Sequence, residues 1–285
     1  MTRVLTALLP IVVIALLSAP STVTFAATPF PVSIENCGTF RTYTHSPKRA
    51  FTMNQAATEI MLALGLHDRM VGTAFLDDAI LEAYADAYAA IPVRTTGYPS
   101  RDELIDAKPD FVYAAFESAF SDEVDGMQDL LDSGVGSYLS PSGCEGRDRS
   151  RPASIETVFA EIRDIARIFG VLPRAEQLIA TYRADLAAIH NQIGAVKTPL
   201  RVLWYDSGTP PFVGACCGTP NEILRLAGAQ NVFADVQGSW GTVSWDDVVA
   251  RNPEVVVFVN ASWSVVAQKR ESLSAAHARA GIDAV

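Results

Sequence analysis

Residues 58–65 read Thr-Glu-Ile-Met-Leu-Ala-Leu-Gly, and residues 100–105 read Ser-Arg-Asp-Glu-Leu-Ile. Both patterns return in the same order later in the chain. There, residues 221–228 read Asn-Glu-Ile-Leu-Arg-Leu-Ala-Gly and residues 244–249 read Ser-Trp-Asp-Asp-Val-Val. A repeat of this kind indicates one supersecondary plan that is used twice. It predicts two similar lobes, and a cleft between two lobes is a usual place for a small ligand.

The segment between the two copies is predicted to connect the lobes. Residues 154–170 and 173–193 keep apolar side chains at helical spacing, interrupted only at Gly170-Val171-Leu172-Pro173. On either side, short apolar runs alternate with helical stretches, which favours parallel sheets covered by helices. We therefore predict an α/β fold of two lobes with parallel-rich sheets, joined by one long backbone helix, with a ligand cleft between the lobes. The boundaries are 27–153 for the N-terminal lobe, 154–197 for the connecting helix region and 198–285 for the C-terminal lobe.

The first 26 residues have the pattern of a secretory signal peptide. Met1-Thr2-Arg3 carries one positive charge, the run from Val4 to Leu17 is almost wholly apolar, and Thr24-Phe25-Ala26 fits a cleavage site. The apolar run is shorter than the roughly 20 residues that a spanning helix needs. We predict export with cleavage after Ala26, and an uncleaved anchor is the alternative. Because no Cys ends the apolar run, a lipoprotein tether is not expected.

The charge and the histidines limit the function. The chain carries a net charge of −10 and has no tract of basic residues, so nucleic acid and anionic membranes are poor partners. The four histidines are scattered and form no recognisable catalytic constellation with a nucleophile. They are His45, His67, His190 and His277. We expect no catalysis, no metal site and no cofactor.

Four cysteines remain after export, and four cysteines allow three pairings. Cys216 and Cys217 are neighbours, and a bridge between them needs strained geometry. Cys37 and Cys144 both fall in the first lobe, so they are the predicted long-range disulfide. No Cys-x-x-Cys or His-x-x-x-His spacing accompanies the cysteines, which disfavours zinc.

Several aromatic and acidic residues are predicted to lie in loops or at strand ends. In parallel α/β sheets, ligands collect outside the carboxyl ends of the strands. The candidates for ligand binding are Phe75, Tyr98, Phe116, Glu117, Tyr205, Asp206, Trp240 and Trp263. Asp77 lies close to Phe75 in the sequence. The alternative for each aromatic residue is a place in the core of its lobe.

Glu59 and Glu222 occupy matching positions in the two copies of the repeat. Thr219-Pro220-Asn221-Glu222 reads as a capping box, which alone would explain Glu222. Glu59 has no such local reason if Asn54 is the cap of its helix. The recurrence of the acid in two different local settings favours a shared external role.

The sequence resembles the class III, iron-siderophore and cobalamin type of substrate-binding protein of ABC importers. The matching stretches of the first lobe are residues 50–53, 58–65, 70–73 and 104–112, and those of the second lobe are 221–235 and 243–257. The resemblance covers about residues 32–270. Residues 36–38, 73–77 and 116–121 are most similar to an actinobacterial branch assigned to precursors of a deazaflavin coenzyme.

The resemblance implies a non-catalytic, exported protein on the periplasmic or extracellular face of the cell envelope. Its cargo would be a ferric siderophore, a similar metal chelate or another bulky ring compound, passed to an ABC permease dimer. Glu59 and Glu222 match the positions through which members dock on the permease. The family continues with a further strand and helix, so the second lobe is expected to be truncated. The alternatives are a secreted haem or metal relay without a permease, and a chelatase-like enzyme.

Overall fold

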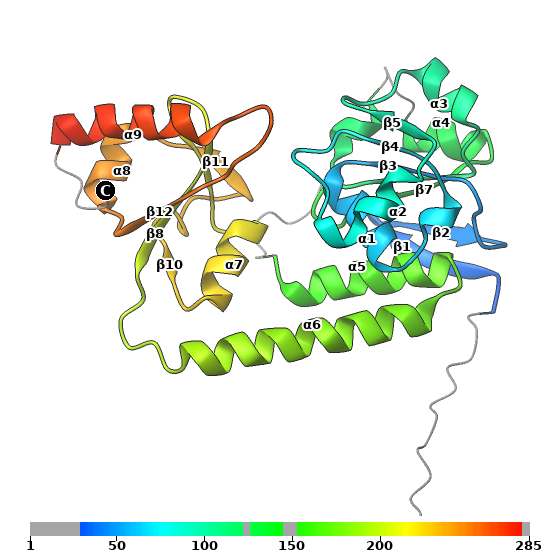
Figure 1. The fold of residues 1–285 in the computed structure, drawn as a ribbon, viewed down its shortest axis with the longest axis horizontal. Helices are drawn as coiled ribbons and strands as arrows, with labels where there is room; N and C mark the ends of the chain where they lie inside the picture. The colour runs from blue at the N-terminus through cyan, green and yellow to red at the C-terminus, as the bar shows by residue number, and fades with distance from the viewer. Residues whose placement is uncertain (1–28, 122–125, 145–152, 281–285) are drawn as a thin grey trace, which may run out of the picture.

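A computed structural model describes residues 29–121, 126–144 and 153–280, so the predicted signal peptide lies outside the described residues. The two predicted lobes stand side by side above a pair of helices (Figure 1). No helix within the described residues is long and apolar enough to cross a membrane.

The first lobe is built on a fully parallel sheet of five strands. The strands are β3 (Ala50–Met53), β4 (Met70–Ala74), β5 (Val93–Thr95), β6 (Phe111–Ala114) and β7 (Gly136–Leu139), in the order β5-β4-β3-β6-β7. Every residue of β3 and β6 is buried, as expected for central strands that helices cover on both faces. The three-residue strand β5 was not predicted from the sequence.

Four helices and three single turns complete the first lobe. The helices are α1 (Gln55–Ala63), α2 (Ala85–Ala89), α3 (Arg101–Ala107) and α4 (Met127–Asp132), and the 3₁₀ turns are His67–Arg69, Glu82–Tyr84 and Glu117–Phe120. Gly65 has a φ of +66° and ends α1, as the sequence indicates. The 3₁₀ turn Glu82–Tyr84 leads directly into α2.

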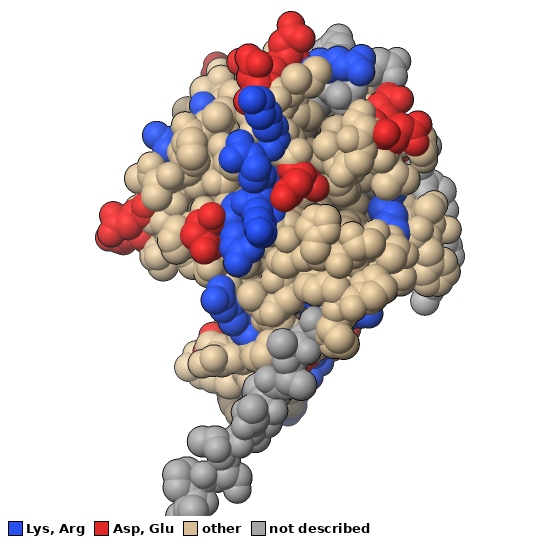
Figure 2. Space-filling model, turned by 90° about the vertical axis from the view of Figure 1, so that its right-hand side faces the viewer, with Lys and Arg blue, Asp and Glu red and all other residues tan. Residues whose placement is uncertain are grey.

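Basic residues stand at the amino ends of the first-lobe strands. Lys48 and Arg49 precede β3, and Arg69 precedes β4. The guanidinium of Arg49 donates to the carbonyl oxygens of Ala107 and Lys108 at the end of α3. Figure 2 shows a stripe of Lys and Arg on the outer face of this lobe, which points away from the second lobe.

A hairpin of two antiparallel strands, β1 (Val32–Asn36) and β2 (Thr39–Tyr43), is attached beside β7. The Asn36 side chain donates to the carbonyl oxygen of Leu139 at 2.7 Å and accepts from its N–H at 2.9 Å. The predicted disulfide between Cys37 and Cys144 is present, with 5.2 Å between the Cα atoms. These contacts replace a backbone ladder between the hairpin and the sheet.

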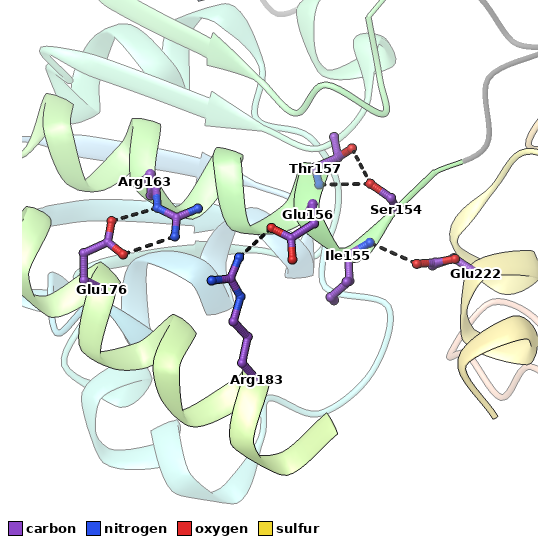
Figure 3. A network of polar contacts seen from close by, with 8 residues as sticks. All are labelled: Ser154, Ile155, Glu156, Thr157, Arg163, Glu176, Arg183 and Glu222. Carbon is purple, nitrogen blue, oxygen red and sulfur yellow. Dashed lines mark hydrogen bonds and ion pairs between the residues drawn. The ribbon is translucent and has the colours of Figure 1, made fainter. Parts of the chain in front are cut away.

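The connection between the lobes consists of two helices, α5 (Ile155–Ile168) and α6 (Leu172–Ile193), which meet at the interruption that the sequence indicates, and α6 is the predicted long helix. Gly170, with a φ of +71°, turns the chain between them. The two helices lie side by side, and α6 runs beneath both lobes (Figure 1). Arg163 pairs with Glu176, and Arg183 pairs with Glu156, across the helix pair (Figure 3).

The second lobe has a mixed sheet. Its strands are β8 (Arg201–Ser207), β9 (Phe212–Gly214), β10 (Gln230–Asn231), β11 (Trp240–Thr242) and β12 (Val255–Phe258), and its helices are α7 (Thr219–Leu226), α8 (Trp245–Arg251) and α9 (Val266–Ala280). The central strand β8 is parallel to β10 and β12 and antiparallel to β9. The antiparallel strands β9 and β11 were not predicted.

The sequence repeat corresponds to a structural repeat. Capping boxes begin α3 at Ser100 and α8 at Ser244. Both helices end on a residue in the left-handed conformation, Lys108 and Asn252, before a proline and a strand. Arg201 donates to the carbonyl oxygen of Asn252, as Arg49 does to that of Lys108. The two lobes therefore share the local design that the repeated motifs predicted.

Candidate functional site

A cavity of about 570 Å³ lies between the two lobes and is lined by both. This volume falls within the range of small-molecule sites. Its walls come largely from the loops that follow strands β4, β6 and β12, from strand β8 itself and from the start of α7. The predicted cleft is therefore present at the predicted edge of the sheets.

The first lobe contributes a stacked aromatic pair to the cleft. The rings of Phe75 and Tyr98 lie 4.7 Å apart at 23°. The Tyr98 hydroxyl accepts from the Asn54 amide at 2.9 Å and lies 2.9 Å from the Ser118 hydroxyl. These two bonds fix the ring, and Phe116 completes the wall beside it.

The second lobe contributes a matching pair. The rings of Phe212 on β9 and Trp240 on β11 stack with centroids 5.8 Å apart at 18°. Trp204, on the central strand β8, also lines the cleft, as do Pro220 and Ile223 of α7. The cleft is thus a mostly aromatic slot with a stacked pair on each side.

Two carboxylates, Asp77 and Asp206, also line the cleft. Asp206 is 8 % exposed and accepts a hydrogen bond from the Ser207 hydroxyl at 2.9 Å. Burial raises the pKa of Asp206, and the negative charge of Asp77 raises it further, while Lys269 and the Ser207 bond act against them. The buried Lys269 ammonium donates to the carbonyl oxygens of Val259 and Ser264.

Asp77 also links the two lobes directly. The indole Nε1–H of Trp263 donates to Asp77 Oδ1 at 3.0 Å, and the Ser262 N–H donates to the Asp77 carbonyl oxygen at 2.8 Å. The residues at the two ends of these bonds come from different lobes. One loop of the second lobe, which also lines the cavity, is therefore bonded directly to the first lobe.

Most of the predicted binding residues lie in the cleft, and two do not. Phe75, Tyr98, Phe116, Asp206, Trp240 and Trp263 line the cavity. Tyr205 is 1 % exposed and packs in the core of the second lobe, with its hydroxyl donating to the Gly208 carbonyl oxygen. Glu117 begins a 3₁₀ turn and is exposed outside the lining.

The error at Tyr205 has a simple cause. Side chains alternate between the two faces of a strand. On β8, Trp204 and Asp206 reach the cleft, so Tyr205 between them faces the core. Phe212 and Ile223 were also missed. Alternation places Trp204 on the same face as Asp206 but does not say which face meets the cleft, and the short strand β9 gave no signal.

The two glutamates that the sequence paired lie in different settings. Glu59 is partly exposed on α1 and accepts a hydrogen bond from Gln55 at 2.9 Å. Glu222 is 7 % exposed, pairs with Arg225 at 2.6 Å, and accepts from the Ile155 N–H at 3.2 Å (Figure 3). The Arg225 hydrogen bond lowers the pKa of Glu222, with burial acting against it.

The predicted helix caps beside these glutamates differ in detail. Helix α7 begins after Gly218, and no side chain caps it, because the Glu222 carboxylate binds Arg225 and α5 instead. Asn54 stands at the N-cap of α1 without capping it, since its side chain binds Tyr98 and the Ala115 N–H. Cys216 and Cys217, which the sequence left open, form a disulfide just before α7.

Comparison with known proteins gives the class. Residues 52–285 match the family model described as periplasmic binding protein, so the chain belongs to that family. It is 25 % identical to an uncharacterized ABC transporter substrate-binding lipoprotein, YvrC, of Bacillus subtilis (strain 168), over 86 % of this chain and 74 % of that one. It is 22 % identical to a vitamin B12-binding protein of Vibrio parahaemolyticus, over 73 % and 70 % of the two chains.

A solved structure supports the same class. The crystal structure of a periplasmic binding protein from Veillonella parvula DSM 2008 is 31 % identical, with a TM-score of 0.78 over 92 % of this chain and 88 % of that one. The protein is thus a non-enzymatic substrate-binding component of an ABC importer at the outer face of the cell envelope. This class sets aside the chelatase-like alternative.

Proposed function

We propose that the protein binds a bulky ring compound or metal chelate in the cleft and delivers it to an ABC permease. The observation that carries this proposal is the cavity of about 570 Å³ with an aromatic pair from each lobe. Flat or bulky ligands bury large areas against such rings. Because both lobes line the cavity, a ligand bound here contacts both of them.

Three cargo classes are compatible with this cleft. A cobalamin-type ring compound is supported by the relative that is described as vitamin B12-binding. A ferric siderophore or similar chelate is supported by the sequence motifs. A deazaflavin-coenzyme precursor rests on the resemblance of residues 36–38, 73–77 and 116–121 alone, and none of the relatives reported above is described in that way.

The binding test uses the protein's own fluorescence, because Trp204, Trp240 and Trp263 line the cleft. Cyanocobalamin and ferrioxamine B are titrated, and native mass spectrometry identifies any cargo retained by protein purified from its source. Trp240→Ala should weaken binding about tenfold or more, as expected for a central aromatic contact. Phe40→Ala, at an exposed position of strand β2 outside the cleft lining, is the control. Equal losses in both variants, or no ligand in either experiment, would contradict the proposal.

We also infer that Glu59 and Glu222 contribute to docking on the permease dimer. Glu59 is the more accessible of the two, whereas Glu222 would have to leave Arg225 and Ile155. Exposed ion pairs contribute about 0–1 kcal/mol each, so docking charges orient more than they tighten. Glu59→Lys should reduce uptake while ligand affinity stays at the wild-type value. Asp185→Lys, on the exposed side of α6, is the control, and normal uptake by Glu59→Lys would exclude its role.

A further inference from the structure

The charged side chains that line the cleft are both acidic. Asp77 and Asp206 are its two acids, and no lysine, arginine or histidine is among the described residues that line it. Basic side chains gather instead on the far face of the first lobe (Figure 2). An anionic cargo would therefore enter this lining without a cationic side chain to pair with.

The nearest cation behind the lining is already engaged. Lys269 is 3 % exposed, and its ammonium donates to the carbonyl oxygens of Val259 and Ser264. Burial is the largest cause of the raised pKa of Asp206, and the charge of Asp77 adds to it. The charge of Lys269 acts in the opposite direction without reversing the shift. A cation brought close to Asp206 would relieve the cost that burial places on its charged form.

The aromatic pairs favour the same charge. The face of an aromatic ring carries negative potential and attracts cations within about 6 Å of its centre. Rings from both lobes reach this cavity, stacked as Phe75 on Tyr98 and as Phe212 on Trp240. Asp77 and Trp263 are bonded to each other between the lobes, so a carboxylate and an indole lie side by side there.

We propose that the cargo of this cleft carries a positive charge, which lies beside Asp206 and Asp77 and against the aromatic side chains. The proposal rests on the proposed function, because it names the charge class of the ligand that the cleft binds. A cationic chelate or a cationic ring compound meets both requirements. Anionic chelates are disfavoured by the same two carboxylates.

The test compares ligands that differ in charge and little else. Ferrioxamine B, its N-acetyl derivative and its N-succinyl derivative share one iron complex and carry one positive charge, none and one negative charge. Aquocobalamin and cyanocobalamin supply a cationic and a neutral corrinoid at neutral pH. Affinities are measured by quenching of tryptophan fluorescence and by calorimetry. Within each set we expect the cation to bind about tenfold more tightly than the neutral form, as for a partly desolvated charge pair.

Two variants assign the preference to the acids. Asp206→Asn should abolish most of the difference between the cationic and neutral probes. Asp77→Asn should reduce it while leaving an amide oxygen to accept from Trp263. Asp185→Asn, on the exposed side of α6, is the matched control and should keep the wild-type preference.

The possible results separate the two proposals. Equal or tighter binding of the neutral and anionic probes would overturn the charge preference and leave solute binding intact. The same holds if cargo retained by the purified protein is anionic by electrophoresis. Binding of no probe, together with no retained cargo, would overturn both the charge preference and the proposed function.

Discussion

Asn54 is a residue whose contacts hold one wall of the cleft. Its backbone has a φ of +76° and a ψ of 152°, an extended conformation at positive φ that glycine adopts easily and other residues rarely adopt. Its amide donates to the Tyr98 hydroxyl, and its Oδ1 accepts from the Ala115 N–H at the end of β6. One side chain thus ties the end of a central strand to an aromatic ring of the cleft.

Replacing Asn54 should be costly because its side chain makes both of these hydrogen bonds. Asn54→Ala leaves the buried Ala115 N–H without its partner and keeps a Cβ at positive φ. We expect a loss of about 3 kcal/mol in the free energy of unfolding, measured by urea denaturation. Asn54→Gly removes only the hydrogen bonds and should lose about 1 kcal/mol less. Equal losses of unfolding free energy in Asn54→Ala and Asn54→Gly would show that the positive φ at residue 54 has no cost for alanine.

Trp263 offers a second prediction at this scale, because its indole N–H joins the lobes at Asp77. Trp263→Phe keeps a ring in the cleft and removes the donor. A hydrogen bond of this kind contributes about 1 kcal/mol, so bound ligand should dissociate about fivefold faster in stopped-flow experiments. Trp245→Phe, outside the cleft lining, should dissociate at the wild-type rate. An unchanged rate in Trp263→Phe would mean that the contact does not limit ligand release.

The sequence was informative about residues where a loop or strand end decides the position. Phe75, Phe116 and Trp263 follow strands, and the carboxyl ends of the strands face the cleft in both lobes. Trp204 and Tyr205 were harder to assign, since either face of β8 could have met the cleft. The choice depends on how the sheet packs against its helices, which the local sequence does not encode.

At the scale of elements, the β1–β2 hairpin shows how side chains replace a sheet ladder. Asn36 makes both hydrogen bonds to Leu139, and Tyr43 donates to the Ser137 carbonyl oxygen at 2.9 Å. The disulfide between Cys37 and Cys144 closes a loop with a sequence separation of 107 residues. The hairpin is therefore attached to the edge of the sheet by covalent and polar contacts together.

The two disulfides should contribute very differently to stability. A long closed loop restricts the unfolded chain strongly, so Cys37→Ser with Cys144→Ser should lower the free energy of unfolding by about 4 kcal/mol. Cys216 and Cys217 are adjacent and close no chain loop of this kind. Their double serine variant is the matched control, with an expected change under about 1 kcal/mol. Denaturant unfolding of both variants decides this, and equal changes would contradict the loop argument.

A buried acid gives α5 a pH-dependent attachment to the first lobe. Glu161 is buried and accepts from the Tyr113 hydroxyl at 2.6 Å and from the Ser140 hydroxyl at 3.0 Å. Burial raises its pKa, while these two hydrogen bonds act against that shift and the nearby Asp164 adds to it. The protonated form is therefore favoured in the folded protein relative to the unfolded chain.

The direction of the pH effect follows from the raised pKa. The contribution of Glu161 is complete below the unfolded value of about 4.3 and is lost as the pH rises through the folded value. Glu161→Gln cannot titrate, whereas Asp164 titrates in both proteins. The free energy of unfolding of the wild type should therefore fall relative to that of Glu161→Gln as the pH rises through this window. Parallel curves in urea denaturation would contradict the assignment.

The sequence predicted the longer elements and missed the shortest. Helices α1, α5 and α6 keep a helical spacing of apolar residues over two or more turns, and that pattern is local. Strands β5, β9 and β11 have three residues each, and their pairing partners lie elsewhere in the chain. Whether such a short segment pairs as a strand depends on the rest of the sheet, so its own three residues do not predict a strand.

At the scale of the whole molecule, the repeat predicted two lobes but not how they are joined. The second lobe is bonded to two backbone N–H groups at and just before the start of α5. The Ala153 N–H donates to the Cys217 carbonyl oxygen at 3.0 Å, and the Ile155 N–H donates to the Glu222 carboxylate at 3.2 Å (Figure 3). Glu222 thus lies at the positive end of a helix packed under the first lobe, where a carboxylate is stabilising. This contact spans 67 residues of sequence, so no local pattern could reveal it.

Glu222 is therefore expected to restrain the movement of the lobes. Glu222→Gln removes the charge at the start of α5 and weakens the pair with Arg225. At neutral pH the free energy of unfolding should fall by about 1–2 kcal/mol, and the Ile155 amide should exchange its hydrogen faster. Because the Arg225 hydrogen bond lowers the pKa of Glu222, this stabilisation is present above the unfolded value of about 4.3. It is lost as the pH falls through the folded value, where wild type and variant should converge.

Arg225→Gln separates the helix contact from the ion pair, because it leaves the Glu222 carboxylate beside Ile155. Its Ile155 amide should exchange at nearly the wild-type rate. Spin labels at the exposed positions Asp132 and Glu271 report the separation of the lobes. In Glu222→Gln the distribution of label distances should broaden, since fewer bonds then hold the second lobe against α5. An unchanged distribution, with uptake nevertheless lost, would assign Glu222 to docking on the permease and not to the restraint of the lobes.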